Sequence, residues 1–265
     1  MPELGQLPLS IRQKSRWLRL AGVPALIVHP DGNLPEVANG TALAPAPAII
    51  WMHGRTANKE IDPGRFLRLA RAGIGVVALD LPGHGERAEA HLTEPQATLE
   101  VVERMANEID AVVDAAVREG PFDRAALAIG GFSAGGMAAL VRLCRPHHFR
   151  AAILEATTGD WRFQHHRAMH DPQRVAALNP IEHLEAWAPI PLLILHAELD
   201  AWVSVEGQRT FVRALVARGI PQELIEFHAF PQTGAPAEHI GFGRYASQAK
   251  DLGAAFLERQ LRRSL

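Results

Sequence analysis

The chain has 265 residues, of which 48% are hydrophobic and 21% are charged, and its formal net charge is −2. This composition is typical of a globular protein and excludes a disordered chain, which would be poorer in apolar residues and carry more net charge. The charge balance also lacks the basic excess of proteins that bind nucleic acid or anionic membranes, so we expect neither partner. The length fits one α/β domain, and we predict a single domain over residues 1–265.

The cysteine content and the N-terminal sequence indicate in which compartment the protein works. The single cysteine, Cys144, excludes an intramolecular disulfide and a cysteine-based zinc site. Arg16 and Arg19 interrupt the first apolar stretch, which therefore does not have the pattern of a signal peptide. No apolar run reaches the ~18 residues that a membrane-spanning helix needs. We therefore expect a cytoplasmic protein.

Short apolar runs alternate along the chain with stretches whose apolar residues are three and four positions apart. The apolar runs predict strands, which in chain order are residues 25–29, 48–52, 74–79, 125–129, 151–154, 192–195 and 223–227. The periodic stretches predict helices over residues 63–72, 101–117, 134–144, 206–217 and 247–262. This alternation predicts a mostly parallel sheet with helices on both faces, and ligands bind such sheets at the carboxyl ends of the strands.

The segment His53-Gly54-Arg55 follows the strand predicted over residues 48–52. The backbone amide of Arg55 is a candidate donor to the oxyanion that forms in acyl transfer, and Gly54 lets the loop approach a substrate. We expect His53 to brace this loop rather than to act as a base. A separate hypothesis concerns the Arg55 side chain, which would attract an acidic substrate if it points into the pocket.

A glycine-rich turn follows the strand predicted over residues 125–129, and its glycines Gly131 and Gly135 flank Ser133 in the pattern G-x-S-x-G. A serine on a tight strand-to-helix turn is held in a strained conformation, and bulky neighbours would clash. The turn places the hydroxyl at a helix N-terminus, which favours developing negative charge. We predict Ser133 as a nucleophile and the Ala134 amide as the second oxyanion donor; the alternative is a plain turn with an idle serine.

A carboxylate after the strand predicted over residues 192–195 is suited to orient a histidine. Asp200 is our candidate for this role, and Glu198 is the near alternative.

Two histidines compete for the role of general base. His228 directly continues the strand predicted over residues 223–227, whereas His239 lies beyond a loop. A base must swing its ring over the edge of the sheet to reach the serine, and a loop position allows that. We therefore favour His239, which gives the chain order Ser133, Asp200, His239.

Together these segments resemble the α/β-hydrolases, and more narrowly the small bacterial serine esterases near the dienelactone hydrolase and prolyl oligopeptidase-like groups. The resemblance rests on residues 51–60, 80–85, the serine turn and residues 196–203, and extends from about residue 48 to the end of the chain. It implies an α/β-hydrolase fold and catalysis without a cofactor. Ala197 stands where these families usually have glycine, and dienelactone hydrolases proper use cysteine as nucleophile, which argues against a dienelactone substrate.

This fold often carries a cap before the strand that bears the acid, and we predict a small helical cap at about residues 159–187. Aromatic candidates for the substrate pocket are Trp202, Trp161 and Phe132, with core packing as the alternative. The cap also contains a histidine cluster, but no carboxylate motif accompanies it, so we expect polar cap residues and no metal site.

The sequence thus predicts a serine carboxylesterase that hydrolyses small-molecule esters through an acyl-enzyme, as a monomer or homodimer. One alternative is a peptidase, amidase or thioesterase on the same fold. The other is a non-catalytic binding protein that has kept the fold.

Overall fold

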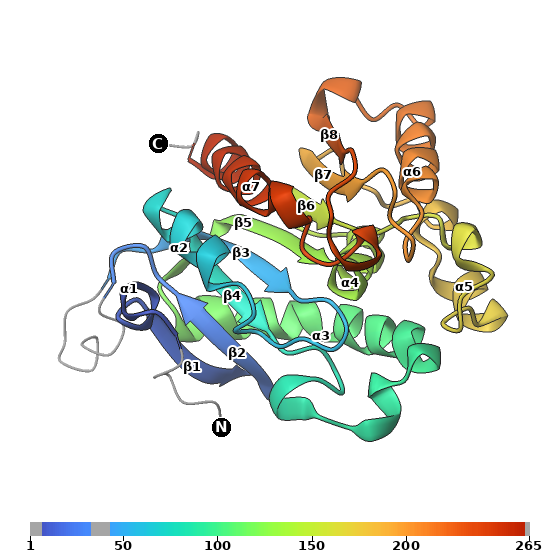
Figure 1. The fold of residues 1–265 in the computed structure, drawn as a ribbon. Coiled ribbons are helices and arrows are strands. Elements are labelled where there is room, and N and C mark those ends of the chain that lie inside the picture. Colours follow the sequence, from blue (N-terminus) through green and yellow to red (C-terminus); the bar gives the residue numbers. More distant parts are fainter. Residues whose placement is uncertain (1–6, 33–42, 263–265) are drawn as a thin grey trace.

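The computed structural model describes residues 7–32 and 43–262, and one eight-stranded sheet organises them (Figure 1). The strands are β1 Ser15–Leu20, β2 Val23–Val28, β3 Ala46–Met52, β4 Gly75–Leu79, β5 Phe122–Phe132, β6 Ala151–Glu155, β7 Leu192–Ala197 and β8 Ile225–Phe230. The α-helices are α1 Leu9–Arg12, α2 Pro63–Arg71, α3 Thr98–Glu119, α4 Ala134–Leu143, α5 Pro172–Leu178, α6 Val205–Ala217 and α7 Ala246–Leu261. Single 3-10 turns lie at Gly85–Arg87, Ala90–Thr93, Pro95–Ala97, Trp161–Gln164, Pro180–Glu182, Gln222–Leu224, Pro236–Glu238 and Gly243–Tyr245.

The strand order is β1-β2-β4-β3-β5-β6-β7-β8. Strands β3 to β8 run parallel to one another, while β2 is antiparallel to both β1 and β4. The β1–β2 hairpin turns at Ala21 and Gly22, which both have positive φ, the conformation that matches the twist of paired strands. The predicted mostly parallel sheet is confirmed.

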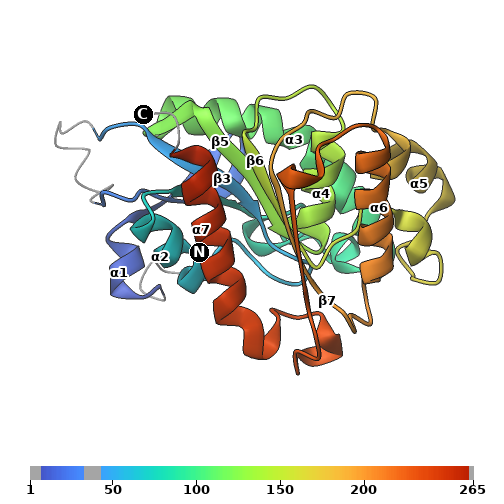
Figure 2. The same cartoon turned by 90° about the horizontal axis from the view of Figure 1, so that it is seen from above.

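Helices cover both faces of the sheet and bury a separate apolar core on each (Figure 2). One core joins the sheet to α3, α4 and α6, and the other joins it to α1, α2 and α7. The start of helix α2 is stabilised by an N-cap. Asp62 accepts a hydrogen bond from the Arg65 amide, and Pro63 occupies the first helical position. Residues that follow the carboxyl ends of β3, β5, β7 and β8 line a common cavity.

The sequence missed the first strand and misplaced the last. In β1, Arg16 and Arg19 break the apolar pattern because an edge strand keeps part of its surface toward solvent. The strand predicted over residues 223–227 is β8, which begins at Ile225 after a 3-10 turn and continues to Phe230. His228 therefore lies within the strand rather than after it.

Residues 159–187 form short helical pieces, including α5, whose side chains contact α3. Arg174 of α5 forms ion pairs with Glu100 and Glu103 of α3, which fixes this segment against the body of the domain. Within residues 7–32 and 43–262, no helix combines the length and the apolar character needed to span a membrane.

Candidate active site

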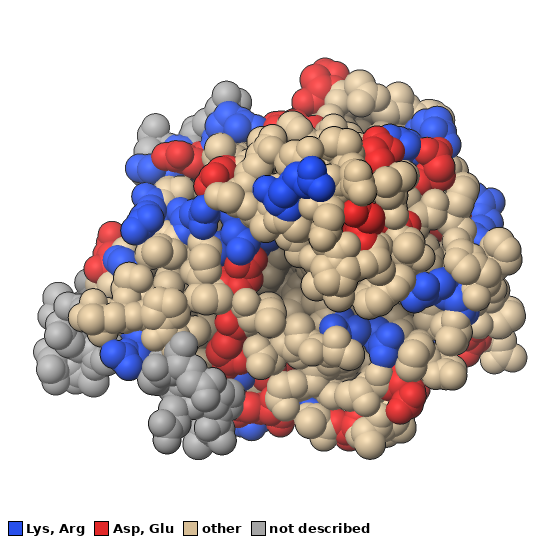
Figure 3. All heavy atoms as spheres, in the orientation of Figure 1, with Lys and Arg blue, Asp and Glu red and all other residues tan. Residues whose placement is uncertain are grey.

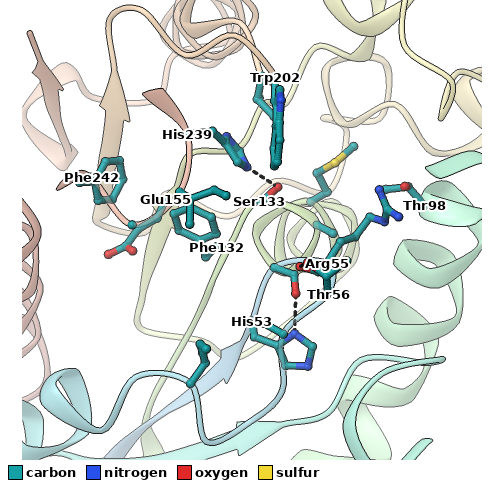
Figure 4. A pocket seen from close by; sticks show the side chains of 18 of the residues that line it. His53, Arg55, Thr56, Thr98, Phe132, Ser133, Glu155, Trp202, His239 and Phe242 are labelled. Atoms are coloured by element: carbon teal, nitrogen blue, oxygen red, sulfur yellow. Dashed lines mark hydrogen bonds between the residues drawn. The ribbon is translucent and has the colours of Figure 1, made fainter. Parts of the chain in front are cut away.

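The turn between β5 and α4 holds Ser133 in a strained conformation, with φ of 51° and ψ of −117°. A side chain at Gly131 would place its Cβ 2.5 Å from the backbone carbon of Gly135, and one at Gly135 would collide with the Met52 carbonyl oxygen. The two glycines are therefore required for α4 to approach β3 so closely. The turn projects the Ser133 hydroxyl from the end of the sheet (Figure 4).

The structure brings Ser133, His239 and Asp200 together from three separate loops. His239 Nε2 lies 3.0 Å from Ser133 Oγ, and His239 Nδ1 lies 2.7 Å from Asp200 Oδ2. Because a carboxylate only accepts hydrogen bonds, Nδ1 carries the proton and Nε2 is left to accept one from the hydroxyl. Proton transfer from Ser133 to His239 needs no rearrangement in this geometry.

Several hydrogen-bond donors hold the Asp200 side chain in place. Its Oδ1 accepts hydrogen bonds from the amides of Trp202 at 2.9 Å and Val203 at 2.8 Å, and the side chain is fully buried. The Ala201 amide donates to the Ala237 carbonyl at 3.0 Å, which ties the loop of the acid to the loop of His239. These contacts set the carboxylate and the imidazole in one orientation.

The two alternative residues lie elsewhere. Glu198, the near alternative for the acid, forms an ion pair with Arg209 at 2.5 Å. His228 is paired within the sheet opposite Leu195 of β7 and does not line the pocket. The structure therefore places Asp200 and His239, and not these two residues, beside Ser133.

The two candidate oxyanion donors, Arg55 and Ala134, both line the pocket at Ser133. The Arg55 loop packs against the serine turn at Gly54, where a Cβ would lie 3.0 Å from the Phe132 ring and 3.5 Å from Ser133 Cβ. Glycine at this position allows the backbone after β3 to approach the serine, which is the placement that oxyanion donors need.

His53 braces its loop, as expected. Its Nε2 accepts a hydrogen bond from the Leu81 amide at 3.1 Å, and its Nδ1 donates to the Gly54 carbonyl at 2.6 Å. Burial lowers the pKa of His53 to about 4, so the ring is neutral near pH 7. Nearby, the buried Asp80 accepts from Lys59 Nζ at 2.9 Å, and Lys59 also pairs with Glu86 at 2.8 Å.

A cavity of about 760 Å³ opens at Ser133, and the space-filling view shows a hollow on this face with charged side chains at its border (Figure 3). Phe132 and Trp202, two of the candidate pocket residues, line the cavity, and both rings pack beside His239, with centroids 5.3 and 5.0 Å away. The prediction for Trp161 is wrong. Its side chain is fully buried in the core and its indole N–H donates to the Thr158 carbonyl at 3.1 Å.

Several pocket residues escaped the sequence analysis because no motif marks them as facing a cavity. Arg167 and Met169 reach the cavity from the predicted cap. Arg65 and Glu155 reach it from α2 and β6 as a buried pair 2.8 Å apart. Nothing in the spacing of these residues indicated that they share one cavity. Among residues 7–32 and 43–262, no three histidine, cysteine, aspartate or glutamate side chains gather as a metal ion would require.

Fold and site together define a serine hydrolase of the α/β-hydrolase class. The chain belongs to the prolyl oligopeptidase family (Peptidase_S9), whose model matches residues 62–263. The resemblance to prolyl oligopeptidase-like hydrolases is thereby confirmed. No curated protein sequence matches the chain significantly.

Solved structures share this fold at low sequence identity. TT1662 from Thermus thermophilus is 24% identical, with a TM-score of 0.69, and the match covers 93% of this chain and 97% of that one. A puromycin-hydrolyzing peptidase from Mycobacterium tuberculosis is 20% identical with a TM-score of 0.74, and a Pyrococcus horikoshii acylaminoacyl peptidase is 20% identical with a TM-score of 0.72. The match covers 96% and 95% of this chain but only 40% and 42% of the two peptidases.

Proposed function

We propose that this protein hydrolyses carboxylic esters of small molecules through an acyl-enzyme on Ser133. The observation that carries the proposal is the hydrogen-bonded series from Ser133 Oγ to His239 and on to Asp200, at 3.0 and 2.7 Å, beside a cavity open to substrate. A serine hydroxyl is a weak nucleophile unless a base removes its proton, and this series supplies the base and the group that orients it.

The reaction follows from the positions of the polar atoms. As Ser133 Oγ attacks the ester carbonyl, its proton passes to His239 Nε2, and Asp200 stabilises the imidazolium that results. The oxyanion of the tetrahedral intermediate faces the backbone amides of Arg55 and Ala134. His239 then gives the proton to the leaving alcohol, and the same residue activates a water molecule that hydrolyses the acyl-enzyme.

Ester hydrolysis is the least demanding reaction for such a site, because an alcohol leaves more readily than an amine. A site able to cleave amides through an acyl-enzyme also cleaves activated esters, whereas the reverse does not hold. The apolar rings around His239, Phe132 and Trp202, suit an uncharged acyl or alcohol group next to the reacting bond.

The direct test is hydrolysis of 4-nitrophenyl esters of increasing acyl length by the wild type and by Ser133→Ala. We expect the variant to lose at least about 10³-fold in kcat/KM while keeping its thermal unfolding midpoint, because only the nucleophile is removed. Substantial esterase activity in the folded variant would remove Ser133 from the mechanism.

A peptidase is the second candidate, and the family match together with the peptidases among the similar structures favours it. The chain spans about two fifths of the length of those peptidases, so their activity does not transfer to it directly. Matched 4-nitrophenyl ester and 4-nitroanilide substrates with the same acyl group separate the candidates. An anilide kcat/KM within about tenfold of the ester value would favour the peptidase.

A further inference from the structure

The charges that line the active-site cavity fall into two groups. Its lining includes four cationic side chains, Arg55, Arg65, Arg167 and Lys250, and two carboxylates, Asp62 and Glu155. Both carboxylates already form ion pairs with two of these cations, Arg65 and Lys250. Glu155 pairs with Arg65 at 2.8 Å, and Asp62 pairs with Arg65 at 3.0 Å and with Lys250 at 2.8 Å.

The other two cations, Arg55 and Arg167, form no ion pair with any residue in the part of the chain that the structure describes. Arg55 donates to the Thr93 carbonyl, and its Nε is buried without a hydrogen-bond partner. Burial lowers the pKa of Arg55, the carboxylate of Glu94 opposes this effect, and the charge of Arg167 adds to it more weakly. Two cations that line one cavity and form no ion pair favour an anion beside them.

The two cations without an ion pair line the same cavity as Ser133. Figure 4 shows Arg55 across Ser133 from Glu155, the carboxylate that pairs with Arg65. The Arg167 guanidinium lies over the Trp202 ring, 6.0 Å from its centroid, and the Trp202 ring packs against His239. An anion held by these arginines would therefore belong to a molecule whose ester is within reach of Ser133.

We propose that Arg55 and Arg167 form a subsite for a substrate carboxylate, so that the preferred substrates are esters that carry a free carboxylate in the acyl or alcohol part. A guanidinium offers parallel N–H donors that match the two oxygens of a carboxylate. This inference rests on the proposed esterase function and specifies its substrate class.

The test compares matched esters that differ in one charge. The first pair is 4-acetoxybenzoate and 4-acetoxybenzamide, with the charge in the alcohol part. The second is monophenyl adipate and phenyl hexanoate, with the charge in the acyl part. The quantity measured is the ratio of kcat/KM for the anionic ester to that for its neutral partner, in the wild type, Arg167→Gln and Arg55→Gln.

We expect each variant to lower this ratio by at least about tenfold for one of the pairs, which corresponds to one charge-assisted contact of about 1.4 kcal/mol. Arg213→Gln is the control, because Arg213 is an exposed residue of α6 outside the cavity and its loss changes the net charge equally. A ratio within twofold of wild type in both cavity variants overturns the subsite. An equal fall in Arg213→Gln does so too, because it would show a general charge effect.

A binding measurement separates this inference from the esterase proposal. In calorimetry without turnover, the wild type should bind 4-hydroxybenzoate at least about tenfold more tightly than 4-hydroxybenzamide, and Arg167→Gln should abolish the difference. If neutral esters are hydrolysed but the carboxylate gives no advantage in either assay, the subsite is wrong and the esterase proposal stands. If no ester is hydrolysed, the calorimetric difference alone decides the subsite.

Discussion

Two histidines line the same cavity, each with a buried aspartate nearby, yet only one has a nitrogen directed at a serine hydroxyl. His53 uses Nδ1 on the Gly54 carbonyl and Nε2 on the Leu81 amide. His239 uses Nδ1 on Asp200 and directs Nε2 at Ser133 Oγ. The comparison shows that residue type and position beside a cavity do not make a histidine a base, because the partner of each ring nitrogen decides its role.

The two aspartates differ in the same way. Asp80 accepts hydrogen bonds from Lys59 Nζ and from the amides of Lys59 and Glu86, so its charge is neutralised within the loop. Asp200 has no lysine or arginine within ion-pair distance in the described part of the chain, and its Oδ2 faces His239. The Asp200 carboxylate therefore meets a requirement of the proposed mechanism, that no cation competes with an imidazolium, whereas the Asp80 carboxylate is held by Lys59.

The largest expected effect comes from removing the base. His239→Ala should lower kcat/KM for 4-nitrophenyl esters by on the order of 10⁵-fold, because Ser133 loses the group that accepts its proton. His228→Ala should leave kcat/KM within about threefold of wild type, since His228 lies in β8 outside the cavity. If His228→Ala lost activity and His239→Ala did not, the base would be His228 and our assignment to His239 would be wrong.

Substitution of Asp200 should affect mainly activity, and substitution of Asp80 should affect mainly stability. Asp200→Asn should lower kcat by roughly 10⁴-fold, because an amide holds the wrong imidazole tautomer. Asp80→Asn should lower the free energy of unfolding by about 3 kcal/mol, because it leaves Lys59 buried with fewer partners, and should keep the kcat of the folded protein. Urea unfolding and steady-state kinetics on both variants provide the check. The comparison fails if Asp80→Asn lowers kcat as strongly as Asp200→Asn does.

His53 should make the fold sensitive to acid. Because burial lowers its pKa to about 4, the folded chain excludes a proton that the unfolded chain binds below the ordinary histidine pKa of about 6.5. The neutral ring therefore contributes its full stability above pH ~6.5, and this contribution, at most about 3 kcal/mol, is lost as the pH falls toward 4.

The measurement is the free energy of unfolding of the wild type and His53→Gln at several pH values from 7 to 4. The wild type should lose more stability than the variant over this interval. Parallel curves for the two proteins would show that His53 does not carry this effect.

The smallest expected effect concerns the aromatic neighbour of the proposed base. Trp202 is 41% exposed and packs against His239, with ring centroids 5.0 Å apart. Trp202→Ala should lower kcat/KM by about tenfold or less, through a less restricted imidazole, and should change the unfolding midpoint little. A loss as large as that of His239→Ala would mean that Trp202 does more than limit the movement of the ring.

Sequence patterns located the residues that follow parallel strands, because strand ends and glycine turns have local signals. Ser133, Asp200 and His239 were each predicted from such positions, and the structure brings their side chains within hydrogen-bond distance. Arg167 had no such signal, since it comes from irregular turns whose path depends on tertiary packing. Trp161 was misassigned because proximity along the chain does not say which side of a loop faces the core.

The central claim, that Ser133 is activated by His239, is tested most directly by labelling with a fluorophosphonate followed by peptide mapping. Wild type should take up one phosphonyl group on the peptide that contains Ser133. Ser133→Ala should take up none, and His239→Ala should react at least about 10³-fold more slowly. A label on another residue, or the same labelling rate in His239→Ala as in the wild type, would contradict the claim.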